Sequence, residues 1–264
     1  MLLLMMDECC FVPKGCERME QVQTTVDGLR AIELTYRPLR DISSGRSISY
    51  LSRTVLNTPG LGTIMPETFR IAAEVSKKSS ELFPLELTQL VRAIQTLGES
   101  DRVFNWISLD IPASIIQSYS MTALTEKTCQ QFSVPASSIC FVLPPQLLTE
   151  KNEAADENIT RLRQLGFHLM LSGFGEGGAQ LLRLSELSVD YVMLSPYVTQ
   201  QIGKNERTDQ AINSIINSIN DLGYEPVADG VKNSAHAETL YRFGCNFCAD
   251  PLSGGYQTLD ELCE

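Results

Sequence analysis

The chain has 264 residues, 43% of them hydrophobic, which is enough for one large domain with a full core or for two small domains. Its formal net charge of −11 disfavours general binding to a nucleic-acid backbone, so no nucleic-acid partner is expected. The apolar start, "MLLLMM", is too short to span a bilayer and lacks a basic leader. Together these features predict a cytoplasmic protein without a membrane segment.

The predicted elements begin after an N-terminal extension, residues 1–30, which we expect to pack on the rest of the molecule or on a second copy of the chain. Two strands are expected at 31–41 and 47–55, joined by the turn "SSGR". Residues 66–97 have a strong helical pattern and are expected to form two helices broken near Pro84.

Short apolar strands then alternate with helices along the rest of the chain. Strands are expected at 104–111, 138–143, 167–175, 189–195, 225–231 and 247–255, and helices at 113–132, 154–166, 179–187, 207–223 and 234–244. Apolar strands that are each followed by a helix indicate a buried parallel sheet. About eight of them in a chain of this length predict one closed α/β barrel over residues 31–264. An open doubly wound sheet is the alternative, although no G-x-G-x-x-G follows the first strand.

Barrel enzymes carry their chemistry at the C-terminal ends of the strands. Here those ends are rich in Ser, Gly, Pro and Met, poor in carboxylates, and free of histidine. The two histidines of the chain, His168 and His236, fall in an apolar strand and on an expected helix, and we interpret both as structural.

Several segments in the expected order match one family. They are "LTYRPLRDISSGRSISYLSR", "GLGTIMPETFRIAAE", "LRQLGFHLMLSGFGEGG", "LSVDYVMLSPYV" and "YEPVADGVKNSAHAETLYRFGCNFCADPLSGGY". From Ile32 to Tyr256 the chain resembles the EAL domain, a barrel that hydrolyses the bacterial second messenger cyclic di-GMP. The resemblance implies an EAL-type (β/α)8 TIM-like barrel, here with a short N-terminal extension.

The resemblance also shows where this chain departs from the family. In the family, carboxylates at the strand ends hold two divalent cations, which need oxygen ligands in fixed positions. The positions of the metal ligands, the lysine that orients water and their neighbours correspond here to Ser49, Ser108, Val142, Ser172, Gly173, Met193, Ser195, Asp229 and Ala249. We therefore expect no catalytic residues, no metal site and no cofactor.

What remains is the family's binding frame. Candidate contacts to cyclic di-GMP are Arg53, Leu51, Arg37, Phe174, Gly175 and Asp229. The two arginines are suited to phosphate because a guanidinium binds such oxygens in a bidentate manner. An alternative interpretation is that Arg53 forms an ordinary ion pair with Asp110 or Glu67.

The eight cysteines are expected to be reduced thiols. Cys245 and Cys248 have C-x-x-C spacing, and Cys9, Cys10 and Cys16 lie in the extension. A zinc site that joins these two groups is a minor alternative.

The sequence thus predicts a non-catalytic EAL-domain regulator in cyclic di-GMP signalling that acts through an unidentified regulatory protein and binds the dinucleotide weakly or not at all. The alternatives are a metal-independent cyclic di-GMP receptor and, more remotely, an active phosphodiesterase. Assembly into a homodimer is left open.

Overall fold

The computed structural model describes the chain except for residues 1–24, 27–28, 101, 177–180 and 250–254. Its strands are β1 (Thr25–Val26), β2 (Leu29–Arg30), β3 (Ile32–Asp41), β4 (Ser47–Thr58), β5 (Gly62–Ile64), β6 (Ile107–Asp110), β7 (Ile139–Leu143), β8 (His168–Phe174), β9 (Tyr191–Leu194), β10 (Glu225–Asp229) and β11 (Phe247–Ala249). Its α-helices are α2 (Pro66–Val75), α3 (Ser79–Glu99), α4 (Ala113–Ile116), α5 (Met121–Phe132), α6 (Glu153–Gln164), α7 (Leu181–Glu186), α8 (Pro196–Thr199), α9 (Glu206–Asp221), α10 (Ser234–Arg242) and α11 (Leu259–Cys263). Two short 3-10 helices, η1 (Ala136–Ser138) and η2 (Pro145–Leu148), flank β7.

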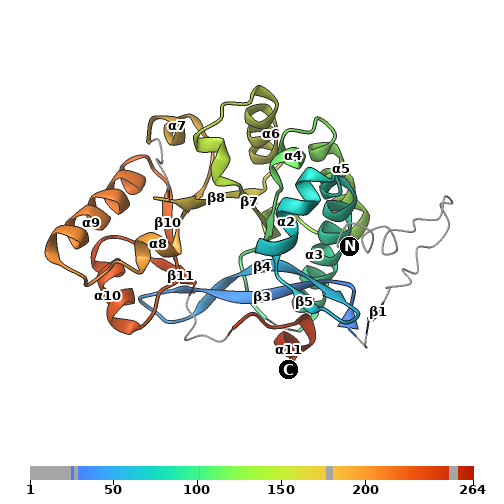
Figure 1. The fold of residues 1–264 in the computed structure, drawn as a ribbon, viewed down its shortest axis with the longest axis horizontal. Helices are drawn as coiled ribbons and strands as arrows, with labels where there is room; N and C mark the ends of the chain where they lie inside the picture. Colours follow the sequence, from blue (N-terminus) through green and yellow to red (C-terminus); the bar gives the residue numbers. More distant parts are fainter. Residues whose placement is uncertain (1–24, 27–28, 101, 177–180, 250–254) are drawn as a thin grey trace.

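Eight strands close into a barrel in the order β3-β11-β10-β9-β8-β7-β6-β4, with β4 pairing back onto β3 and β5 added beside β4. The helices surround this barrel, and α11 lies outside it near β3, at the C-terminal end of the chain (Figure 1). The α/β barrel predicted from the sequence is confirmed.

The barrel is not wholly parallel, because β3 runs antiparallel to both of its neighbours, β4 and β11. The reason is the short connection between β3 and β4, which is a hairpin turn containing Gly45 at φ +67°. A parallel connection needs a crossover of a dozen or more residues. The parallel arrangement indicated by the strands that are followed by helices therefore does not extend to β3, whose direction is set by the turn.

The helix break predicted near Pro84 is also misplaced. The chain turns between α2 and α3, where Lys77 adopts a left-handed φ of +60°. Pro84 lies inside α3. The helix continues through it because Phe83 and Leu87 are fully buried against the core, while the carbonyl that loses its partner belongs to the exposed Ser80.

The segment 113–132, expected as one helix, forms two, because the chain turns at Gln117–Ser120 between α4 and α5. The turn is tied to the neighbouring helix, since the Asn158 side-chain amide donates to the carbonyls of Ile116 and Ser118. A long-range hydrogen bond of this kind leaves no local pattern in the sequence.

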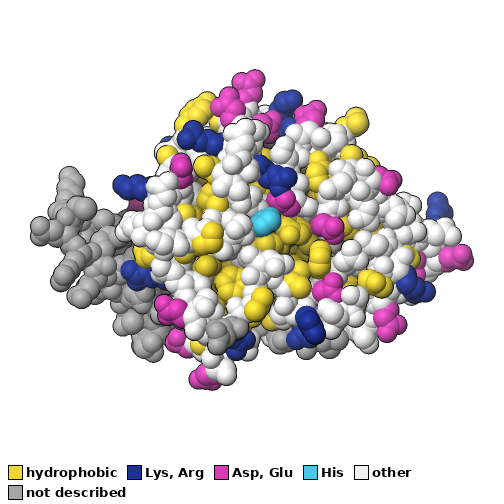
Figure 2. All heavy atoms as spheres, turned by 180° about the vertical axis from the view of Figure 1, so that it is seen from behind, with side chains coloured by type: hydrophobic (Ala, Val, Ile, Leu, Met, Phe, Trp, Pro, Cys, Tyr) yellow, Lys and Arg dark blue, Asp and Glu magenta, His cyan; other side chains and the backbone are white. Residues whose placement is uncertain are grey.

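Two apolar layers stabilise the fold. Inside the barrel, the interior cluster consists of Leu39, Leu51, Trp106, Cys140, Met170, Val227 and Ala249, with Tyr191 and Met193 packed against it. A larger cluster fills the space between the barrel and its helices. In the view from behind, hydrophobic side chains gather in the middle of the face and charged side chains surround them (Figure 2). No helix in the described ranges is long and apolar enough to cross a membrane.

Candidate functional site at the barrel mouth

The candidate site lies where β3 and β4 present alternate side chains to the barrel interior. Leu51 belongs to the interior cluster, so its neighbours two residues away on β4, Ser49 and Arg53, face the same side. The register pairs Leu51 with Arg37 and Ser49 with Leu39. Three of the predicted ligand contacts, Arg37, Leu51 and Arg53, are thereby brought together.

Hydroxyl and apolar groups occupy the strand ends that the family uses for metal ions. Ser49 and Ser195 are fully buried, and within the described ranges their hydroxyl oxygens have no hydrogen-bond partner. The Ser108 hydroxyl accepts a hydrogen bond from the Ser52 amide at 3.0 Å, and the Ser172 hydroxyl donates to the Leu143 carbonyl at 2.9 Å.

Apart from Asp229, the remaining positions of this set carry apolar side chains or, at Gly173, no side chain. Met193 packs on the interior cluster, Ala249 belongs to it, and Val142 is buried. Mg²⁺ and similar hard cations are held mainly by carboxylate and carbonyl oxygens. Hydroxyls, a thioether and methyl groups do not offset a doubly positive charge in a buried site. No cluster of three or more His, Cys, Asp or Glu suited to a metal occurs among the residues that the structure describes. The described side chains at these positions therefore do not fit a divalent metal centre.

Asp229, the one carboxylate left in this set, is already engaged. Its Oδ1 lies 2.8 Å from Nη2 of Arg37, and the same oxygen accepts a hydrogen bond from the Gly230 amide at 2.7 Å. Both side chains of the ion pair are largely buried, with 13% of Arg37 and 21% of Asp229 exposed. The ion pair leaves neither charge available without rearrangement.

Arg53 has a different partner from the one that the alternative interpretation expected. Among the described residues it forms no ion pair within 4.0 Å, so the expectation of a pair with Asp110 or Glu67 is wrong. Its guanidinium carbon lies 3.8 Å from the centre of the Tyr256 ring, and that of Arg37 lies 4.9 Å from the same ring. Tyr256 is thus a component of the site that the sequence did not reveal.

Phe174 and Gly175 have structural roles. Phe174 is 3% exposed and packs in the cluster between barrel and helices. Gly175 has a φ of +89°, and a Cβ there would clash with Cγ2 of Val198. Unlike the two arginines, Phe174 and Gly175 offer no polar side chain to a ligand, and their contacts are those of packing.

Thr54, the residue after Arg53 on β4, belongs to a buried polar network with Glu86 and Arg70. The Glu86 side chain is completely buried, accepts a hydrogen bond from Thr54 at 2.6 Å and pairs with Arg70 at 2.8 Å. Burial, opposed by the charge of Arg70 and supported by those of Glu86 and Glu67, raises the pKa of Asp110 to about 6.

The raised pKa of Asp110 predicts that the free energy of unfolding depends on pH. Because the folded carboxyl holds its proton up to about pH 6, the folded state binds more protons than the unfolded state between roughly pH 4 and pH 6. The free energy of unfolding that Asp110 contributes therefore falls as the pH rises through this range. Asp110→Asn should stabilise the protein by about 2 kcal/mol more near pH 7 than near pH 4. Urea unfolding of both proteins at the two pH values measures this difference, and an equal effect at both would contradict it.

Of the described cysteines, Cys129, Cys140, Cys245 and Cys248 are buried free thiols, and Cys263 is an exposed free thiol. Burial raises the pKa of Cys245 to about 12, and its Sγ donates to the Pro226 carbonyl at 3.3 Å. Cys248 is 3% exposed. The other members of the suggested zinc site, Cys9, Cys10 and Cys16, lie outside the described residues, as does most of the N-terminal extension.

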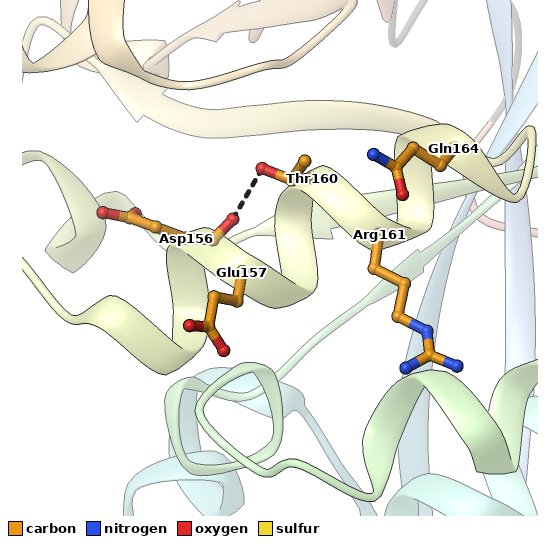
Figure 3. Close-up of a pocket in the computed structure, with 5 residues that line it drawn as sticks. All are labelled: Asp156, Glu157, Thr160, Arg161 and Gln164. Carbon is orange, nitrogen blue, oxygen red and sulfur yellow. Dashed lines mark hydrogen bonds between the residues drawn. The ribbon is translucent and has the colours of Figure 1, made fainter.

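A separate hollow of about 520 Å³ lies along the exposed face of α6, lined by Asp156, Glu157, Thr160, Arg161 and Gln164 (Figure 3). The labelled side chains all come from this one helix, and the hydrogen bond drawn is an ordinary one from the Thr160 hydroxyl to the Asp156 carbonyl, at 2.9 Å. No convergent chemistry appears there, so the barrel mouth remains the candidate site.

Comparison with known proteins agrees with this fold. The EAL domain family matches residues 19–249, and the chain belongs to this family. The chain is 25% identical over 234 residues to the cyclic di-GMP phosphodiesterase PdeB of Shewanella oneidensis, covering 88% of this chain and 27% of that protein. It is 24% identical over 214 residues to the cyclic di-GMP phosphodiesterase RocR of Pseudomonas aeruginosa, covering 81% and 54%. The chain thus spans between about a quarter and a half of the length of these two relatives.

Solved EAL structures share the architecture. The EAL enzyme Bd1971, in a form bound to cAMP and cyclic di-GMP, has a TM-score of 0.83 at 17% identity, covering 88% of this chain and 64% of that one. The PaMucR phosphodiesterase in complex with cyclic di-GMP has a TM-score of 0.81 at 19% identity, covering 88% and 94%. The EAL-type barrel expected from the sequence is confirmed.

Proposed function

We propose that this EAL domain is a non-hydrolytic regulator in cyclic di-GMP signalling that acts by binding another protein. Membership of the EAL family and the names of the relatives support the place in cyclic di-GMP signalling. The observation that carries the rest is the set of side chains at the strand ends, where Ser49, Ser108, Ser172, Ser195 and Met193 leave a divalent cation without carboxylate ligands.

Weak binding of the dinucleotide follows from the charges at the mouth. Cyclic di-GMP carries two negative phosphates, and the protein itself has a net charge of −11. Among the described residues, Arg53 and Arg37 lie on the same face of β3 and β4 as the interior residue Leu51, and Arg37 is paired with Asp229. A charge-assisted hydrogen bond contributes roughly 1.5–3 kcal/mol, whereas micromolar affinity needs about 8 kcal/mol. Two such contacts fall short of that value.

One observation favours the second candidate, a metal-independent cyclic di-GMP receptor. The Arg53 guanidinium has no carboxylate partner among the described residues and retains donors that suit a phosphate. The two candidates differ in what the ligand does to the output. A receptor changes its affinity for a partner when the dinucleotide binds, and an interaction module does not.

The test is affinity capture with the whole chain as bait, in extracts of the native cell, with and without added cyclic di-GMP. We expect one protein partner in stoichiometric amount, retained equally in both conditions. Glu67→Lys, an exposed charge reversal in the first turn of α2, should reduce capture if the barrel mouth is the interface. Glu157→Lys on the exposed face of α6 is the matched control.

Two outcomes would change the assignment. Capture that depends on added cyclic di-GMP would establish the receptor. Failure to retain any protein beyond those held by an unrelated barrel bait would contradict the proposal of an interaction module.

A further inference from the structure

The C-terminal segment, residues 255–264, is fixed against the barrel at Gln257. Its amide donates to the Tyr36 carbonyl at 2.8 Å, and the Tyr36 amide donates to the Gln257 carbonyl at 2.7 Å. The next residue, Thr258, begins α11 with a capping box completed by Glu261, and Leu262 of this helix is 3% exposed. These contacts hold the backbone beside β3, so the position of Tyr256 is set by the fold rather than by a loose chain end.

Tyr256 is adjacent to this bridge, so its side chain points to the opposite side from that of Gln257. The ring lies within 3.8 Å of the Arg53 guanidinium carbon and 4.9 Å of that of Arg37. Burial raises the pKa of the Tyr256 hydroxyl, which keeps it neutral. A neutral ring therefore covers both of the cations that face the former ligand position.

With the Tyr256 ring over them, both arginines have hydrogen-bond donors that lack an acceptor. Among the described residues, no acceptor is bonded to the Arg53 guanidinium, and the buried Nε atoms of Arg53 and Arg37 are both without a partner. Buried polar groups in proteins are normally satisfied, and a planar guanidinium is best satisfied by a bidentate anion. A ring face supplies electrostatic attraction to a cation but accepts no hydrogen bond of that strength. The donors at this position are therefore those that a phosphate would satisfy better than Tyr256 does.

We propose that Tyr256 is an autoinhibitory contact, in which the C-terminal segment holds the ring over Arg53 and Arg37 and excludes a phosphodiester ligand that competes for the same cations. The inference rests on the proposed function, because it explains the weak binding of cyclic di-GMP by a non-hydrolytic domain. Removal of the ring should expose the guanidinium faces, and it should do so only while Arg53 is present.

The experiment is calorimetric titration of cyclic di-GMP into four proteins: wild type, Tyr256→Ala, Tyr256→Phe and the double variant Tyr256→Ala/Arg53→Ala. We expect Tyr256→Ala to bind at least about tenfold more tightly than wild type, as loss of the two cation–π contacts would allow. Tyr256→Phe keeps the ring and should bind within about threefold of wild type. The double variant should lose the gain.

Thermal unfolding of each variant checks the fold, and Tyr256→Leu replaces Tyr256→Ala if the smaller side chain destabilises the protein. Leucine fills the space without a π face, so it should also increase affinity. A folded Tyr256→Ala or Tyr256→Leu protein that binds no more tightly than wild type would overturn the inference. Failure of the proposed function is recognised separately, since hydrolysis or submicromolar binding would already appear in the wild-type titration.

Discussion

Purified protein incubated with cyclic di-GMP and either Mg²⁺ or Mn²⁺ is expected to release no linear dinucleotide above a no-protein control. Among the described residues the strand ends carry Ser49, Ser108, Ser172 and Met193, and we expect these side chains to hold no cation that would activate water. Because enzymes accelerate their reactions by at least about 10⁶-fold, the expected deficit relative to a competent enzyme is at least of that order. Chromatographic separation of the products measures it, with an active EAL phosphodiesterase in the same buffer as the positive control.

The variant Ser49→Glu sharpens this prediction, since it restores the signature glutamate alone. Activity should stay at background because Asp229, the one other carboxylate of the set, is paired with Arg37, and the remaining positions are uncharged. The free energy of unfolding should fall, because Ser49 is fully buried, its hydroxyl has no partner among the described residues, and a charged carboxylate is costly to bury. Hydrolytic activity that increases with protein concentration and co-elutes with the folded protein would refute the account of the site.

The largest loss of stability is expected from Glu86→Ala. Glu86 is 0% exposed and links Thr54 on β4 to Arg70 on α2, so its removal leaves the mostly buried Arg70 guanidinium without its carboxylate. Breaking a buried pair in this way costs about 3 kcal/mol or more. Urea denaturation followed by circular dichroism measures the change.

The matched control is Glu81→Ala on the same helix. Glu81 is 47% exposed and pairs with Lys78 at 3.4 Å, so its loss should cost less than about 1 kcal/mol. Similar losses for the two variants would show that the Glu86 network does not stabilise the junction of β4 with α2 and α3.

Much of this architecture could be predicted because it is recorded in local patterns. The alternation of Ser49, Leu51 and Arg53 on one strand predicts that they share a face, and the structure places Leu51 in the barrel interior as that pattern requires. The rhythm of apolar strands and helices predicts the closed barrel in the same way. What failed were choices between local alternatives, such as Pro84 or Lys77 as the helix break.

The partners of the two arginines could not be predicted, because they come from distant parts of the chain. Arg37 pairs with Asp229, 192 residues away, and Tyr256 approaches Arg53 only because the Gln257 backbone pairs with Tyr36. No composition or periodicity near residue 256 signals these contacts. The long-range pairing of a chain end therefore decides what covers the site, and the sequence pattern decides only where the site lies.

The most direct test of the account is the dependence of cyclic di-GMP affinity on a divalent cation. Equilibrium binding to the wild-type protein would be measured in Mn²⁺ and again in excess EDTA, at one ionic strength because phosphate contacts are screened by salt. The side chains at the strand ends predict weak binding with dissociation constants that agree within about twofold, which is less than about 0.5 kcal/mol. Binding that is tenfold or more tighter in Mn²⁺ would show that the mouth still holds a metal ion and would contradict the account.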